Sequence, residues 1–134
     1  MPEEYVQWFE SLQKPGWIPS FEMLGEFWIV AYPLAMLAFC LIIYLVWSGE
    51  LKKRVLCPVI ANLLFSLGSG VLVAAYPALI FLIILIALYA LTLGWVLAEV
   101  VNIRHRPALL LLAPYTLWVV SVSVAVLELA RLNW

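Results

Sequence analysis

The sequence predicts an all-α integral membrane protein, a single domain over residues 1–134 built as a bundle of four transmembrane helices. Of its 134 residues, 67% are hydrophobic and 11% are charged. A soluble domain of this size leaves too much surface exposed to hide that many apolar side chains. The apolar residues gather into four runs, each long enough for the roughly 20 helical residues that cross a hydrocarbon core. These runs span residues 21–47, 55–75, 77–101 and 108–131.

The charge and the cysteine content exclude several classes of protein. The formal net charge is −1 and no long basic run is present, which argues against a nucleic-acid partner. Cys40 and Cys57 fall at different depths of two apolar runs, so no disulfide between them is expected. Histidine and cysteine do not cluster at metal-ligand spacing, so no metal site is expected. The first twenty residues hold three glutamates and no apolar core, so no cleavable signal peptide is expected.

Residues 1–20, which precede the first run, are expected to form a lid over one end of the bundle. They begin as a polar, amphipathic lead-in and become rigid at the sequence KPGWIPS, residues 14–20. Pro15 and Pro19 fix their own φ angles and bias the residues before them toward extended backbone, so this part is a shaped loop. Trp17 lies between the two prolines. Ser20 suits the N-cap position of the helix that follows.

The run 21–47 exceeds the thickness of a bilayer, so the helix is expected to tilt or kink. Pro33 supplies a cause for a kink. Residues at i+3 and i+4 steps along this run form an aromatic stripe with small gaps, made of Phe21, Gly25, Trp28, Tyr32, Ala35 and Phe39.

The next two runs differ in the faces that they offer. The run 55–75 carries Asn62, Ser66 and Ser69 on one face, and such residues let membrane helices approach closely and hydrogen-bond. The run 77–101 is nearly all leucine, isoleucine and alanine until Glu99. We therefore expect it to be the helix most exposed to lipid.

The last run, 108–131, begins just after Pro107, a favoured early-turn residue. It carries Pro114, Tyr115 and Trp118, and Ser121 shares the face of Trp118. All connections between the runs are short, which implies antiparallel neighbours and an up-and-down bundle.

The distribution of lysine and arginine predicts the orientation of the bundle. The first and third connections lie on one side and hold Lys52, Lys53, Arg54, Arg104 and Arg106. Basic loops concentrate on the cytoplasmic side of membrane proteins. Both termini and the proline-rich lid are therefore expected outside, in a multi-pass protein of a prokaryotic inner membrane.

The depth of the polar and aromatic residues suggests a site. With a rise of 1.5 Å per residue, Trp28 lies about 12 Å below the outer end of its helix. Trp118 and Asn62 lie about 20 Å below the outer ends of theirs. Flat indole walls suit a flat apolar ligand, which the Asn62 amide would orient. Alternatively, Asn62 is an amide that packs helices together.

At these residues the chain resembles the translocator protein family, also called tryptophan-rich sensory proteins (TspO/MBR-like). One signature, W-[FY]-x-x-L-x-K-P-x-W-x-P, runs from Trp8 to Pro19. A tryptophan follows fourteen residues after the lysine of that motif, at Trp28. Asn62 matches an asparagine of the family, and Pro114 begins a P-Y-x-x-W motif. The likeness covers essentially the whole chain.

The resemblance implies binding of protoporphyrin IX, haem or related tetrapyrroles as ligands, with no certain resident cofactor. It also implies light-driven degradation of porphyrin at two tryptophans, here Trp28 and Trp118, so whether the protein is an enzyme stays open. The ligand-binding residues that it suggests are Trp17, Pro19, Phe21, Gly25, Tyr32, Asn62, Ser66, Pro114, Tyr115 and Ser121. No histidine lies in an apolar run, so an axially ligated haem is disfavoured. Interfacial belts also account for some tryptophans, Trp17 and Trp47 among them.

The chain departs from the family in one large respect. Family members have five helices, and the first of them precedes the motif that here begins at Trp8. A partner is therefore expected to pack against the first two apolar runs, either as a twofold homodimer or as another membrane subunit. Two alternative functions remain open: a non-catalytic small subunit of a larger membrane complex, and a porphyrin carrier.

Overall fold

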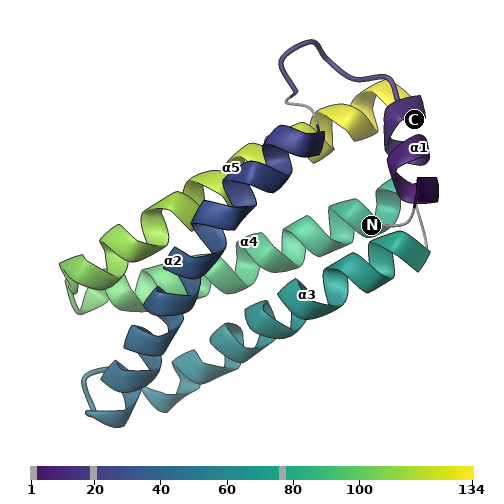
Figure 1. The fold of residues 1–134 in the computed structure, drawn as a ribbon. Coiled ribbons are helices and arrows are strands. Elements are labelled where there is room, and N and C mark those ends of the chain that lie inside the picture. Colours follow the sequence, from purple (N-terminus) through teal and green to yellow (C-terminus); the bar gives the residue numbers. More distant parts are fainter. Residues whose placement is uncertain (1–2, 19–20, 76–77) are drawn as a thin grey trace.

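The computed structural model (Figure 1) describes residues 3–18, 21–75 and 78–134, apart from the side chains of residues 5, 21, 22, 24, 25 and 70–74. Within these ranges the secondary structure is helical and contains no strand. The elements are α1 (Glu3–Ser11), α2 (Phe21–Trp47), a 3-10 turn η1 (Lys53–Val55), α3 (Leu56–Ala75), α4 (Leu79–Asn102) and α5 (Arg106–Asn133).

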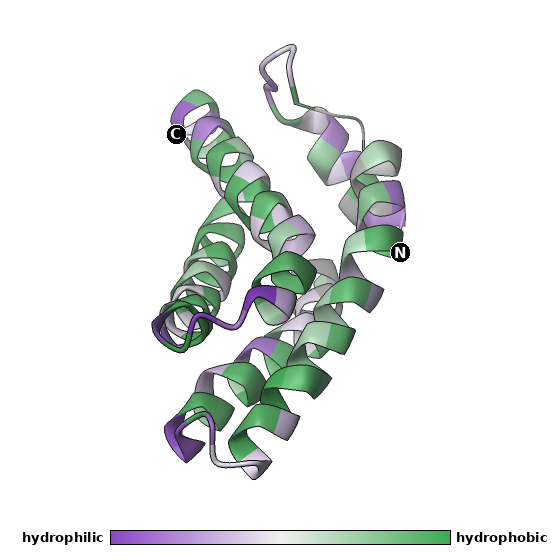
Figure 2. Cartoon of the chain, turned by 90° about the vertical axis from the view of Figure 1, so that its left-hand side faces the viewer, coloured by the Kyte–Doolittle hydropathy of each residue, from purple (hydrophilic) through white to green (hydrophobic). Residues whose placement is uncertain are grey.

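The long helices follow the apolar runs, and α2 to α5 begin and end within two residues of the expected limits. In the described part of the chain, three helical stretches are long and apolar enough to cross a membrane: Glu26–Trp47, Leu79–Asn102 and Arg106–Asn133. The protein is therefore a multi-pass membrane protein. α3 has 20 residues, but five of its side chains, those of residues 70–74, lie outside the described set, so the fourth crossing stays a prediction. Figure 2 shows the same organisation, with hydrophobic residues along the helices and hydrophilic ones gathered at their ends.

The helices do not pack in the order in which they follow one another. α2 lies against α5, α5 against α4, and α4 against α3, whereas α2 and α3 make little contact (Figure 1). α4 lies between two neighbours, yet neither of the other two spanning stretches is less buried than α4, so the expectation that α4 is the helix most exposed to lipid stays a prediction. The share of its most apolar window that is buried, 28%, equals that of α5. A leucine-rich surface does not reveal its partner, since lipid tails are as apolar as another helix.

Small residues allow α2 to approach α5 closely. Ala31, Ala35 and Ala38 recur at steps of four and three along α2 and are fully or almost fully buried. Pro33 lies inside α2 and Pro114 inside α5, where each removes one backbone hydrogen bond from its helix. The rest of the main core is made of larger side chains, including Phe39, Ile42, Leu45, Val59, Val96 and Leu112.

The end of the bundle where α2 meets α3 is closed by a tight turn and an ion pair. Gly49 adopts φ 84°, and the N–H groups of Glu50 and Leu51 donate to the Leu45 carbonyl at 2.9 and 3.0 Å. This arrangement is a Schellman-type helix end, which favours glycine at the left-handed position. From η1, Nε of Arg54 donates to Glu99 on α4 at 2.9 Å. The carboxylate of Glu99 is thus paired although the residue is buried.

α1 lies across the opposite end of the bundle (Figure 1). Its nine residues are too few to span a membrane. Phe9 is buried against Leu79 of α4 and Leu129 of α5, and Trp8, Leu12, Ile18 and Leu82 pack around them. The lead-in that the sequence marked only as amphipathic is therefore a short helix held by apolar contacts.

Candidate functional site

Four aromatic rings from α2 and α5 meet in one cluster, which we call the indole cluster: Trp28, Tyr32, Tyr115 and Trp118. The ring centroids of Trp28 and Trp118 are 4.3 Å apart, with their planes tilted by 42°. Trp28 also contacts Tyr32, at 5.1 Å between centroids. Tyr115 lies parallel to Trp118, at 6.4 Å and 9°. All four residues are at i+3 or i+4 spacing on their helices, so each helix presents its two rings on one face.

Tyr115 is held in place by hydrogen bonds that cross three helices. Its hydroxyl donates to Oδ1 of Asn62 on α3 at 2.7 Å. Nδ2 of Asn62 then donates to Oγ1 of Thr92 on α4 at 2.8 Å. The Thr92 hydroxyl in turn donates to the Leu88 carbonyl of the same helix at 2.8 Å. Asn62 is fully buried. Its amide therefore satisfies two partners that water cannot reach.

Serine hydroxyls extend this network along α3. The hydroxyl of Tyr89 on α4 lies 3.5 Å from Oγ of Ser69, which donates to the Ser66 carbonyl at 3.1 Å. The Ser66 side chain is also near the Tyr115 hydroxyl. Thr92 and Tyr89 were missed by the sequence analysis. A lone hydroxyl residue within a run of leucine and alanine is the signal that could have found Thr92.

The indole N–H of Trp118 has no partner. Among the described residues, its Nε1 atom is buried and makes no hydrogen bond. An unsatisfied buried donor is rare in folded proteins and carries a free-energy cost. Trp118 can therefore donate to an acceptor on a ligand without breaking an existing bond.

The remaining candidate residues are more dispersed. Trp17 lies between α1 and α2 with 54% of its surface exposed. Pro114 and Ser66 are half-buried on α5 and α3, and Ser121 is exposed on α5, away from the buried face. Pro19 lies outside the described residues, as do the side chains of Phe21 and Gly25.

The cluster presents aromatic faces on which a flat apolar ligand could stack. Tryptophan and tyrosine offer flat apolar faces with one polar hydrogen each. In the described part of the chain, no group of three or more histidine, cysteine, aspartate or glutamate residues could hold a metal ion. The two indoles also contact each other directly. Their depths, as estimated from the sequence, had placed a space between them.

Comparison with known proteins gives one decisive result. The profile of the TspO/MBR family matches residues 1–131. The chain belongs to the TspO/MBR family. A search of curated proteins finds no match. The matched range contains all four residues of the indole cluster together with Asn62 and Thr92. Membership in the TspO/MBR family supports a membrane role of the sensory, porphyrin-binding kind.

Proposed function

We propose that this protein is a membrane sensor that binds a tetrapyrrole, such as protoporphyrin IX, or a similar flat apolar ligand at the indole cluster. The observation that carries the proposal is the meeting of Trp28, Tyr32, Tyr115 and Trp118 from two helices in a TspO/MBR chain. A macrocycle gains most from flat aromatic neighbours, and the free N–H of Trp118 suits a ligand carboxylate or carbonyl.

Binding between the two indoles requires a change of shape. A flat ligand between two rings needs about 7 Å between them, twice the contact distance of two carbon atoms. The centroids of Trp28 and Trp118 are only 4.3 Å apart. α2 must therefore move away from α5, or one indole must rotate. Because α2 makes little contact with α3, its movement breaks few other contacts. A ligand that favours the separated state shifts the population toward it, which is a sensory output.

Light-driven chemistry at the same cluster needs no general acid or base. An excited porphyrin accepts one electron from an adjacent indole, which leaves a porphyrin radical anion and an indole radical cation. Trp28 and Trp118 lie close enough for one to share the oxidation of the other. Phenylalanine stacks in a similar way but is far harder to oxidise.

The test separates binding from photochemistry. Trp28→Phe and Trp118→Phe should each keep most of the porphyrin binding, measured by absorbance titration, and should abolish light-driven loss of the pigment. Trp95→Phe, on the exposed surface of α4, is the matched control and should change neither property. Unchanged affinity and photobleaching in the Trp28, Trp118 double variant would reject the site.

The weak contact between α2 and α3 favours a second role, in which the chain is one subunit of a larger assembly. A twofold homodimer or another membrane subunit would cover this side of the bundle. Purification of the protein in nanodiscs, followed by a mass measurement, distinguishes the cases. A monomer that binds porphyrin alone contradicts the subunit role. Gly25 and Gly70, whose side-chain positions lie outside the described set, are the sites where leucine should disrupt such a contact.

A further inference from the structure

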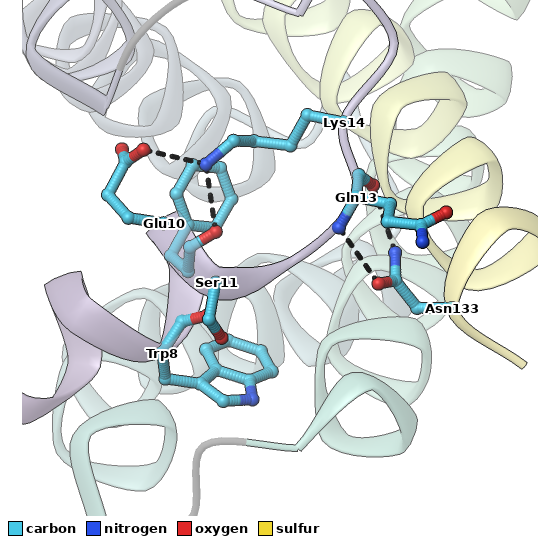
Figure 3. Close-up of polar contacts among 7 residues, drawn as sticks. Trp8, Glu10, Ser11, Gln13, Lys14 and Asn133 are labelled. Carbon is cyan, nitrogen blue, oxygen red and sulfur yellow. Dashed lines mark hydrogen bonds and ion pairs between the residues drawn. The ribbon is translucent and has the colours of Figure 1, made fainter.

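The side chain of Asn133 joins the segment after α1 to the end of α5. Figure 3 shows the amide of Asn133 facing the backbone of Gln13. The Gln13 N–H donates to Oδ1 of Asn133 at 2.9 Å, and Nδ2 of Asn133 donates to the Gln13 carbonyl at 2.9 Å. Nδ2 also donates to the Leu129 carbonyl at 2.8 Å, within α5. Both amide hydrogens and the amide oxygen are therefore used.

This pairing requires a side-chain amide. α1 ends at Ser11, so the backbone groups of Gln13 have no partner within a helix. The planar amide of Asn133 offers one donor and one acceptor side by side. They pair with the carbonyl and the N–H of Gln13 in the way that backbone groups pair between neighbouring β-strands. Aspartate keeps the acceptor for the Gln13 N–H but has no hydrogen for the Gln13 carbonyl, and alanine has neither group.

Beyond Gln13, the segment makes only local hydrogen bonds within the described residues 14–18. Nζ of Lys14 donates back to the Phe9 carbonyl at 3.0 Å and to Glu10 at 2.7 Å (Figure 3). The Ile18 N–H donates to the Pro15 carbonyl at 3.1 Å. A Cβ added at Gly16 would meet nothing within 4 Å, and Trp17 is mostly exposed. Asn133 thus supplies the polar attachment of a segment that is otherwise held to the bundle by the apolar contacts of Leu12 and Ile18.

Leu82 connects this segment to the indole cluster. It packs on the small cluster around Phe9, together with Leu12 and Ile18. It also packs on the main core, whose partly buried members include Trp28 and Trp118. Displacement of residues 12–18 therefore removes Leu12 and Ile18 from a small cluster that they share with Leu82, and Leu82 also belongs to the same core as the indoles.

We propose that Asn133 is a latch that holds residues 12–18 over the end of the bundle. When its two hydrogen bonds to Gln13 break, residues 12–18 move away and the side chain of Leu82 becomes accessible to solvent. The ligand part of the proposal rests on the proposed function: the latch sets how fast a flat apolar ligand passes between this face and the indole cluster. Loss of such a latch raises the association and dissociation rate constants of the ligand by the same factor, so the affinity stays nearly constant.

Two measurements test the latch without any ligand. The first is hydrogen–deuterium exchange of the full-length protein in nanodiscs, read at residues 12–18. The second is the rate at which a membrane-impermeant thiol reagent modifies Leu82→Cys, in a background with Cys40→Ser and Cys57→Ser. In Asn133→Ala, exchange at the Gln13 amide and modification of the new thiol should both rise, on the order of tenfold for the loss of two hydrogen bonds. Asn133→Asp should give a smaller rise.

Arg131→Ala is the matched control, because Arg131 lies at the same end of α5 and pairs with Glu128 rather than with the segment. It should change neither rate. Equal exchange and equal thiol modification in Asn133→Ala and the wild type would overturn the latch, and should Asn133→Ala fail to fold, the same comparison is decided with Asn133→Asp.

Protoporphyrin IX is the probe for the ligand part. Stopped-flow absorbance should show both rate constants raised several-fold in Asn133→Ala, with their ratio within about twofold of the wild type. Rates that stay unchanged while Leu82→Cys becomes accessible would overturn gating. If the wild-type protein does not bind protoporphyrin IX, the proposed function is rejected. The hydrogen-exchange and thiol-modification rates still test the latch in that case.

Discussion

At the scale of single residues, the buried side chain of Asn62 is hydrogen-bonded to two other helices. One amide joins α3 to α5 through Tyr115 and to α4 through Thr92. In hydrocarbon no water replaces a lost partner, so each of these groups depends on the others. Asn62 therefore acts first as a helix-packing amide, the alternative that the sequence left open, and it positions Tyr115 beside Trp118.

Substitution of Asn62 should lower stability more than it lowers ligand affinity. Asn62→Leu leaves the Tyr115 hydroxyl and Thr92 without their partner, and we expect a loss of about 1–2 kcal/mol of unfolding free energy. Thr92→Val removes one of the two bonds and should lose about half as much. Unfolding by sodium dodecyl sulfate in mixed micelles measures both. A normal unfolding curve for Asn62→Leu together with weak porphyrin binding would assign the amide to the ligand instead.

At the scale of elements, the contact between α2 and α5 sets the geometry of the indole cluster. Ala31, Ala35 and Ala38 bring the two helices close, and Trp28 lies on the same face two turns before Ala35. A protein core resists added volume because it is already close-packed. We therefore expect these alanines, which lie outside the indole cluster, to set the separation of the two indoles.

Enlargement of Ala35 should push α2 away from α5. Ala35→Leu should lower the unfolding free energy by about 1–3 kcal/mol, as overpacking of a buried site does. Leu37→Ala is the control, since Leu37 is 57% exposed toward lipid and should change stability by about 0.5 kcal/mol or less. Intrinsic fluorescence should shift in Ala35→Leu, because the contact of Trp28 with Trp118 loosens. Equal stability of the two variants would show that the alanines do not set the spacing.

The elements also show what the sequence could and could not predict. The limits of α2 to α5 were predictable because each apolar run is long enough to cross a bilayer and is bounded by a short polar or turn-forming connection. The grouping of Trp28, Trp118 and Asn62 followed from polar and aromatic residues at unusual depth. The direct indole contact did not follow, since heights taken from the helical rise differed by about 8 Å and ignored tilt and side-chain reach. The neighbours of α4 were unpredictable, because leucine packs equally well on lipid and on a helix.

At the scale of the whole molecule, positive charge gathers at one end. Five basic residues at the end opposite α1 are all exposed, in the two connections, in η1 and at the start of α5: Lys52, Lys53, Arg54, Arg104 and Arg106. Acidic residues prevail at the other end, where Glu3, Glu4 and Glu10 lie on α1. The positive-inside rule predicts that the basic end lies in the cytoplasm and residues 12–18 lie outside.

Labelling from the two sides of the membrane checks this orientation. With Cys40 and Cys57 replaced by serine, cysteine at the exposed positions Ser11 and Ser48 should react from opposite sides. Ser11→Cys should react with an impermeant reagent in intact cells, and Ser48→Cys only after the membrane is opened. Reaction of Ser48→Cys in intact cells would reverse the orientation and move residues 12–18 to the cytoplasm.

The pairing of α2 with α5 also has a consequence for biosynthesis. The ribosome makes α2 before α3 and α4, and α5 only after them. During insertion α2 therefore waits in lipid without its main neighbour, and Asn62 waits without the Tyr115 hydroxyl. Without α5, helices α2, α3 and α4 form an incomplete intermediate in which Oδ1 of Asn62 lacks its donor, although Nδ2 can still reach Thr92. We expect a chain stopped before Arg106 to be recognised by membrane quality control and degraded, even though its α2, α3 and α4 are unchanged.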